Sequence, residues 1–367
     1  MKNILILILA FYSLQNCYSQ NIDYSSFYRN RMEILEFIGL KQNVKSVKGF
    51  MYLPIEKFGE VENGKLIYNC YKKFNTKEQI LEYKTYTYNN LSNGKIHETY
   101  LYNEIGNKIE KNNYYTNLES QGELLSRERY KYDESNNLND DSHYNSDGSL
   151  SSKTTYTYNE NQKEIEKKII SNWSNKQEFN IITKKYDINN NIVEINSDSP
   201  YYYGKTKEIF TLDERNNILI EKCLSSTDGN LLYYKTYKYD IQNNKIEYNS
   251  FNEKGLFNYK ITYKYDERNN VTEENKYKTD GILLNTETCI YDENNKKIEE
   301  SINGKRATYV YDTTGILIES NYYTSAGNLK SRNFSKFEYD IKGNWIKRID
   351  FKDEKAIMKY ERVIEYF

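Results

Sequence analysis

Much of this chain alternates polar and apolar residues with a period of two, as half-buried β-strands do. In residues 256–266 the side chains of one face are aromatic or aliphatic, and those of the other are Asn, Lys or Thr. The apolar positions are Phe257, Tyr259, Ile261, Tyr263 and Tyr265. Turn-forming sequences bound such runs. We therefore predict antiparallel strands joined by tight turns, with one aromatic, packed face and one wetted face.

A Tyr-x-Tyr-Asp signature recurs at intervals of 20 to 28 residues. Its second Tyr is found at Tyr132, Tyr158, Tyr186, Tyr239, Tyr265, Tyr291, Tyr311 and Tyr339, and Leu212 fills the one gap. A fixed period of this length indicates units of one supersecondary element each, which are unstable alone and must stack. Each unit is expected to be two antiparallel strands with two tight turns.

The residues after the signature specify a turn. Counting from the second Tyr, position +1 is Asp or Asn, +4 is usually Asn or Gly, +7 is usually apolar and +8 is usually Glu. Asn and Gly tolerate left-handed backbone dihedrals, and Asp at the head of a turn accepts hydrogen bonds from nearby amides. Stacked carboxylates could instead bind Ca²⁺, but the turn explains both positions. The Glu at +8 is interpreted as a cross-strand partner of Lys.

Two-residue hairpins are predicted at Asn63-Gly64, Asn93-Gly94 and Asn303-Gly304. Two strands in each unit give some twenty strands in all. We expect an all-β fold, an extended, strongly twisted antiparallel β-hairpin repeat array, with one short N-terminal helix over residues 24–38 as a cap on the first sheet edge.

The predicted organisation has four parts. Residues 1–19 form a signal peptide, and residues 20–60 an N-terminal helical cap and first strand. Residues 61–350 hold the β-hairpin repeats, and residues 351–367 a C-terminal cap strand.

The signal peptide has Lys2 before a short apolar run and Ser19 at a cleavage site. The run is too short to span a bilayer, so the mature chain is expected to lack a transmembrane segment. Lipidation at Cys17 is the alternative. Export would place the protein in the periplasm, on the outer-membrane surface or outside the cell. The remaining cysteines, Cys70, Cys223 and Cys289, allow at most one disulfide, and a free buried thiol at Cys289 is equally consistent.

Composition disfavours several classes of function. The chain has 40 Tyr among 367 residues and only two Pro, and its 52 basic and 53 acidic residues are interleaved. It lacks the one-sided basic face that nucleic acid requires. The only histidines, His97 and His143, fall in different units, which disfavours a catalytic triad or a histidine-based zinc site. We expect no enzyme activity, no metal and no cofactor.

Aromatic side chains are the main candidates for ligand contact, because flat rings stack on sugar faces and on extended chains. Their regular alternation favours packing. Tyr201, Tyr202 and Tyr203 break the pattern after Pro200, and Trp173 lies in another irregular segment. These four are the predicted contact residues.

The Tyr-Asp pair followed by a left-handed Gly or Asn resembles the YD repeats of the RHS family. The resemblance rests on Tyr311-Asp312-Thr313-Thr314-Gly315 and on Tyr339-Asp340-Ile341-Lys342-Gly343-Asn344, and covers roughly residues 86–350. It implies a coiling β-sheet, which in large members is a shell enclosing a toxin domain. Here the units are longer, and Asn mostly replaces Gly. Val44-Lys45-Ser46-Val47 and Gly343-Asn344-Trp345 are similar to segments of uncharacterised exported bacterial repeat proteins.

The leading hypothesis is a non-enzymatic exported repeat protein that presents an extended β-surface for binding or scaffolding at the cell envelope. Its partner would be a protein or glycan at the cell surface. One alternative is a glycan-binding or glycan-cleaving surface protein. Another, from the resemblance, is a component of an RHS-type toxin or secretion system.

Overall fold

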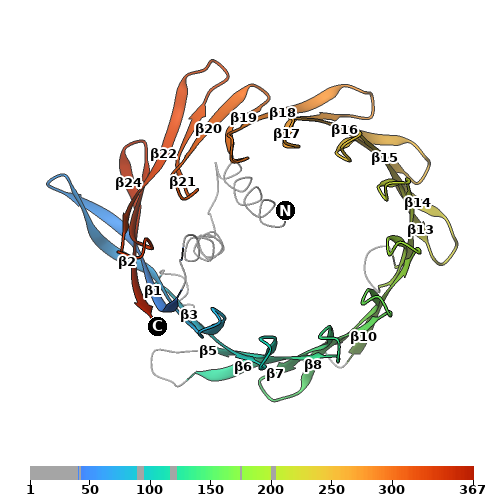
Figure 1. Cartoon of the computed structure of the whole chain (residues 1–367), viewed down its shortest axis with the longest axis horizontal. Helices are drawn as coiled ribbons and strands as arrows, with labels where there is room; N and C mark the ends of the chain where they lie inside the picture. The colour runs from blue at the N-terminus through green and yellow to red at the C-terminus, as the bar shows by residue number, and fades with distance from the viewer. Residues whose placement is uncertain (1–39, 41–42, 89–94, 116–121, 174–175, 200–203) are drawn as a thin grey trace. The chain divides into compact units, whose positions relative to one another are not determined.

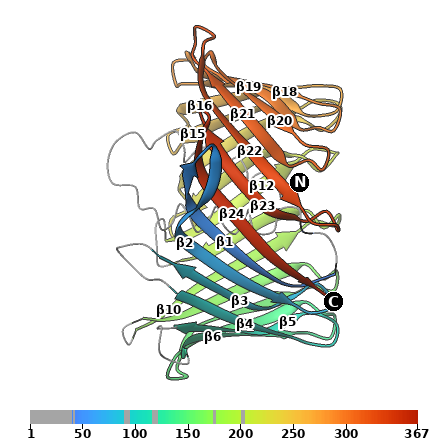
Figure 2. The ribbon, with the colours of Figure 1, turned by 90° about the vertical axis from the view of Figure 1, so that its left-hand side faces the viewer.

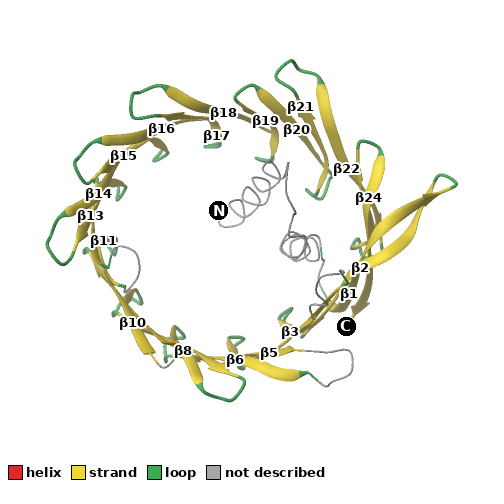
Figure 3. Cartoon of the chain, turned by 180° about the vertical axis from the view of Figure 1, so that it is seen from behind, coloured by secondary structure: helices red, strands yellow, loops and turns green. Residues whose placement is uncertain are grey.

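The computed structural model describes residues 40, 43–88, 95–115, 122–173, 176–199 and 204–367. In this part of the chain the regular structure consists of 24 β-strands, joined mostly by short turns, with no helix (Figure 3). It therefore contains no helix long and apolar enough to cross a membrane. The all-β prediction is confirmed for these residues.

The first twelve strands are β1 (Val44–Lys57), β2 (Glu60–Phe74), β3 (Ile80–Thr87), β4 (Lys95–Tyr102), β5 (Lys108–Tyr115), β6 (Glu123–Tyr132), β7 (Leu138–Asn145), β8 (Leu150–Tyr158), β9 (Glu164–Trp173), β10 (Lys176–Tyr186), β11 (Ile192–Asp198) and β12 (Lys205–Leu212). The next twelve are β13 (Ile218–Ser225), β14 (Leu231–Tyr239), β15 (Lys245–Asn252), β16 (Phe257–Tyr265), β17 (Val271–Tyr277), β18 (Leu283–Tyr291), β19 (Lys297–Ile302), β20 (Lys305–Tyr311), β21 (Leu317–Tyr323), β22 (Leu329–Tyr339), β23 (Trp345–Lys352) and β24 (Lys355–Tyr366).

The chain divides into two compact units. Unit 1 comprises Met1–Ile96, Tyr311–Ile318 and Phe334–Phe367, and unit 2 comprises His97–Val310 and Glu319–Asn333. Within unit 2, each strand from β5 to β19 pairs antiparallel with the next, as Figure 1 shows for the run from β5 to β18. The predicted hairpin pairing is therefore confirmed.

The predicted open architecture is wrong, because the first described strand pairs with the last. β1 pairs antiparallel with β2 on one side and with β24 on the other (Figure 2). Met51 lies opposite Tyr360, and Val47 opposite Ile364. All 24 strands belong to one sheet, so its connectivity is that of a closed β-barrel. This pairing gives hydrogen-bond partners to the backbone groups at the edge of β1, the edge that an N-terminal cap was expected to cover.

The predicted helix over residues 24–38 and the predicted signal peptide over residues 1–19 lie outside the described residues. Asn93-Gly94 also lies outside them. The hairpin at Asn303-Gly304 is confirmed, with both residues at positive φ between β19 and β20. The hairpin at Asn63-Gly64 is wrong.

The turn between β1 and β2 is formed by Phe58 and Gly59, which have φ values of 52° and 84°. Gly64 instead lies inside β2, where the β1–β2 register shifts. A Cβ on Gly64 would lie 2.2 Å from the carbonyl oxygen of Leu53. The glycine at this position is therefore required by close backbone approach at a bulge, and not by a turn.

Hydrophobic burial is concentrated in unit 1. There, Val44, Val47 and Phe74 form a buried cluster against Ile80 and Ile364. In the described residues of unit 2, the buried hydrophobic residues are Cys223, Cys289 and Ala307. Most other side chains of unit 2 are partly exposed on both faces. The predicted packed aromatic face is thus only partly buried, because one layer of sheet cannot enclose its own side chains.

The pairing of β1 with β24 can be tested by cross-linking. Lys48 and Val363 lie opposite each other and are both exposed. We expect K48C/V363C to form a disulfide under mild oxidation, detected as a mobility shift on a non-reducing gel. The control K48C/I357C places the second cysteine six residues away along β24, about 20 Å, and should not cross-link. Equal behaviour of the two variants would contradict the closed sheet.

Candidate functional site

The repeated Asp organises a tight turn at one edge of the sheet. Asp213 Oδ1 accepts hydrogen bonds from the backbone N of Arg215 at 2.9 Å and of Asn217 at 2.8 Å. Its Oδ2 accepts a third bond from the Asn217 side chain at 3.0 Å. The backbone N of Asn216 bonds to the carbonyl of Asp213, and Asn216 has a φ of 66°. This is a turn followed by a left-handed residue, so the turn interpretation is confirmed.

The same carboxylate pattern recurs in neighbouring turns. It is found at Asp187, Asp240, Asp266, Asp312 and Asp340. Two earlier turns, headed by Asn75 and Asn103, were missed by the sequence analysis. Asn75 Oδ1 accepts from the backbone N of Gln79, and Asn103 Oδ1 accepts from that of Asn107. Phe74 replaces the signature Tyr before Asn75. Tyr100 and Tyr102 precede Asn103, and that signal was available in the sequence.

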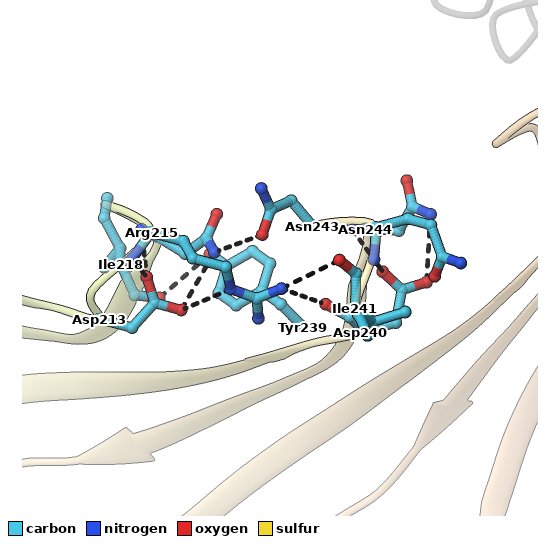
Figure 4. Close-up of polar contacts among 10 residues, drawn as sticks. Asp213, Arg215, Ile218, Tyr239, Asp240, Ile241, Asn243 and Asn244 are labelled. Atoms are coloured by element: carbon cyan, nitrogen blue, oxygen red, sulfur yellow. Dashed lines mark hydrogen bonds and ion pairs between the residues drawn. The ribbon is translucent and has the colours of Figure 1, made fainter.

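Successive turns are linked to each other through side chains. Asn217 Nδ2 donates to Asn243 Oδ1 in the turn of the next repeat, at 3.0 Å. The Arg215 guanidinium reaches across to the carbonyl oxygens of Asp240 and Ile241, at 3.0 and 3.1 Å (Figure 4). The Asn-to-Asn link recurs at Asn161–Asn190, Asn191–Asn216, Asn244–Asn269 and Asn270–Asn295. Most of the distinctive polar residues of the signature are therefore used within the turn edge.

The signature Tyr has a structural role of its own. The Tyr239 hydroxyl, on β14, donates to the carbonyl oxygen of Ile218 at 3.0 Å, on the adjacent strand β13. The strand register shifts between Lys238 and Tyr239. The same bond, always to the residue six positions after the preceding signature, is made by Tyr132, Tyr158, Tyr186, Tyr265 and Tyr291. An intramolecular hydrogen bond of this kind contributes about 1 kcal/mol, so the hydroxyl stabilises the strand pair next to each register shift. Leu212 cannot make this bond.

We call the sheet face that carries the Glu at position +8 the polar face. Lys185 and Lys207 lie 2.7 and 2.9 Å from the two carboxylate oxygens of Glu194. The equivalent pairs Lys238–Glu247 and Lys264–Glu273 are separated by 2.8 and 2.9 Å. The predicted Lys–Glu partnership is confirmed. Hydrogen bonds from Lys185, Lys207 and Asn196 lower the pKa of Glu194 to about 2.

The opposite, tyrosine face carries the signature Tyr residues and their neighbours at alternate positions. We define the tyrosine strip as four rings of this face on β14 to β16, namely Tyr237, Tyr248, Tyr259 and Tyr263. The rings of Tyr237 and Tyr248 are 5.4 Å apart, and those of Tyr248 and Tyr259 are 5.5 Å apart. Burial, and to a lesser extent Glu274, raise the pKa of Tyr263 to about 12, so the hydroxyl stays protonated at neutral pH.

Two carboxylates adjoin the tyrosine strip. Tyr263 lies opposite Glu274, and Glu274 lies opposite Glu287 on β18. Burial and the charge of Glu287 raise the pKa of Glu274. Like charges directly opposite each other destabilise a sheet, so this pair is the local arrangement that the fold itself does not explain.

The described structure does not test the four predicted contact residues as a group. Tyr201, Tyr202 and Tyr203 lie outside the described residues, and Trp173 is the last residue of β9, where its backbone pairs with Lys176.

The histidines and cysteines each have their own local surroundings. His143 Nε2 lies 3.2 Å from Asp141 Oδ1, and His97 lies against the Tyr114 ring. Cys70, Cys223 and Cys289 are buried, and no disulfide joins them in the described part of the chain. No group of three or more His, Cys, Asp or Glu in the described part of the chain is arranged to hold a metal ion.

Comparison with known proteins identifies similar solved structures at low identity. No family model matches the chain, and no curated protein matches it. The crystal structure of TcdB2-TccC3-Cdc42 is 13% identical over 82% of this chain, with a TM-score of 0.34. The TcdB2-TccC3 crystal structure is 12% identical over 80% of this chain, with a TM-score of 0.34. This chain covers 18% of each of those chains.

A porin-like protein from Bacteroides uniformis ATCC 8492 is 8% identical, with a TM-score of 0.26, over 88% of this chain and 98% of that one. We draw no functional argument from similarity at this level.

The contribution of the signature hydroxyl to the free energy of unfolding can be measured by removing it from one repeat and adding it to another. Y265F removes the bond to the Lys245 carbonyl and should lower the free energy of unfolding by about 1 kcal/mol. L212Y should add the missing bond, to the carbonyl of Ile192, and raise that free energy by a similar amount. Denaturant titration measures both. The control L212F adds a ring without a hydroxyl, and a gain as large as that of L212Y would contradict this role.

The polar face should make stability pH-dependent. Because the pKa of Glu194 is lowered from 4.5 to about 2 in the folded protein, its stabilisation is present above pH 4.5 and is lost as pH falls toward 2. The difference in Tm between wild type and E194Q should therefore be largest above pH 4.5 and should disappear near pH 2. Thermal unfolding at several pH values checks this. E160Q, at an exposed turn position, is the control, and a pH-independent difference for E194Q would contradict the prediction.

Proposed function

We propose that this protein is an exported, non-enzymatic repeat protein whose sheet presents an extended surface for binding or scaffolding at the cell envelope. One observation carries the proposal. In unit 2 both faces of the sheet are built from regularly spaced, partly exposed side chains, and few hydrophobic residues are buried between them. A sheet of this kind contributes accessible surface and not an enclosed core.

The use of the signature residues supports the non-enzymatic part of the proposal. Asp and Asn at the turns bond to backbone amides and to each other, as at Asp213, Asn217 and Asn243. The signature hydroxyls bond to backbone carbonyls. Groups bound in this way support the fold and are not free to act as general acids, bases or nucleophiles.

We further infer that the repeats are of the RHS/YD type. The supporting observation is the turn chemistry, in which a Tyr-Asp pair precedes a left-handed Gly or Asn. Gly315 and Gly343 have φ values of 88° and 75°, and Asn243 has 67°. The same geometry at Asn and Gly positions explains why the two residue types interchange in this repeat.

Retention on the native envelope tests the proposed function. The tagged full chain, incubated with envelope fractions of the source cells, should be retained in a saturable manner, since an extended surface offers a finite number of sites. Heat-denatured protein is the control for non-specific adsorption. If the folded protein stays in the unbound fraction at all concentrations, or is retained no better than the denatured control, the proposal is wrong.

A further inference from the structure

We propose that the tyrosine strip binds a neutral polysaccharide chain, with the Glu274 carboxylate accepting hydrogen bonds from sugar hydroxyls. This inference rests on the proposed function and names the class of its ligand. It also concerns different residues from the four contact candidates that the sequence indicated.

The geometry of the rings provides the stacking surface. Tyr237, Tyr248 and Tyr259 lie on three consecutive strands and are partly exposed. Adjacent rings are 5.4 and 5.5 Å apart and are tilted by 50° and 49°. A chain that contacts all three rings therefore runs across the strands with a twist. Aromatic rings stack on the apolar faces of pyranose sugars, and each contact adds apolar burial without requiring a charge on the ligand.

Hydroxyl bonds hold these rings in place before any ligand arrives. The Tyr237 hydroxyl donates to Glu221 Oε2 at 2.7 Å. The Tyr248 and Tyr259 hydroxyls are 3.0 Å apart and share a hydrogen bond. Restricting the side chains in the free protein lowers the entropy cost of ordering them on binding. The strip is thus preorganised for a ligand that contacts ring faces.

The charges of the surrounding face favour a neutral ligand. On the tyrosine face from β13 to β19, four carboxylates are matched by four ammonium groups. They are Glu221, Glu274, Glu287 and Glu300, and Lys235, Lys245, Lys276 and Lys297. Lys235 lies 2.6 Å from Glu221, and Lys297 lies 2.9 Å from Glu300. A face with no net charge does not attract polyanions or polycations.

Glu274 supplies the polar contact at one end of the strip. Within the described residues, its carboxylate has neither a hydrogen bond nor an ion pair, although it is half-buried next to Glu287. A carboxylate offers several acceptor positions for hydroxyl donors. Sugar hydroxyls can satisfy them without adding charge, and would reduce the cost of placing two carboxylates opposite each other.

The experiment is a calorimetric titration of the purified full chain with defined hexasaccharides. The neutral probes are maltohexaose, cellohexaose and mannohexaose, and an oligogalacturonide hexamer is the charged comparator. We expect at least one neutral hexasaccharide to bind more tightly than the charged one. Y259A should weaken this binding by about tenfold, as expected for one lost stacking contact.

Two further variants separate binding from folding. E274Q removes the charge while keeping the shape, and breaks no hydrogen bond of the described structure. It should weaken binding by about threefold to tenfold with little change in Tm. Y234A is the matched control, since Tyr234 lies three residues before Tyr237 on β14 and stacks on Phe251 on the opposite face. It should leave binding unchanged.

Each outcome decides the proposal. It is overturned if no neutral hexasaccharide binds, if the charged hexamer binds more tightly, or if Y259A and E274Q bind as wild type does. The envelope retention assay distinguishes the two levels of inference. Saturable retention of wild type, Y259A and E274Q alike would leave the proposed function standing and remove the polysaccharide as its ligand. Loss of retention by wild type itself would remove the proposed function.

Discussion

The fold depends on one local constraint, the left-handed residue that follows each signature turn. At Asn243 the backbone has a φ of 67°, a conformation that costs most residues about 1 kcal/mol or more. The preceding carboxylate of Asp240 offsets this cost, because it accepts bonds from the backbone N of Gln242 and of Asn244. The turn then sets the register of the two strands it joins. The cross-strand partners on both faces follow from that register.

Links between turns extend this local order along the sheet edge. Asn-to-Asn hydrogen bonds and the guanidinium of Arg215 connect turns to the turns that follow them, and the signature hydroxyls connect adjacent strands next to a register shift. Individual bonds of this kind contribute about 1 kcal/mol. Because most repeats contain several of them, they stabilise a single layer of sheet that buries few hydrophobic side chains. The polar residues thus take over part of the role that a hydrophobic core has in other folds.

The sequence predicts this structure where the signal is local. Residues within one or two neighbouring repeats are enough to predict the strands, the signature turns, the Asn303 hairpin and the Lys–Glu pairs. Closure could not be predicted in this way. The contact between Ser46 and Glu365, at 2.8 Å, joins residues 319 positions apart, and no periodic pattern marks it. The prediction of a hairpin at Asn63-Gly64 failed for a similar reason. Gly64 is required by its close approach to the carbonyl oxygen of Leu53, which lies on another strand. The tyrosine strip could not be predicted from the sequence of one strand, because its rings come from three strands.

The pairing of β1 with β24 also determines the order of assembly. While the ribosome is still synthesising the C-terminal part, β1 can pair with β2, but the strand for its other edge does not yet exist. Exposed strand edges recruit strands of other molecules, and large β topologies form slowly. The nascent chain therefore passes through a long interval in which two copies could exchange their terminal strands. Synthesis of β24 ends that interval, so damage to this strand should have effects far beyond the hydrogen bonds that it removes.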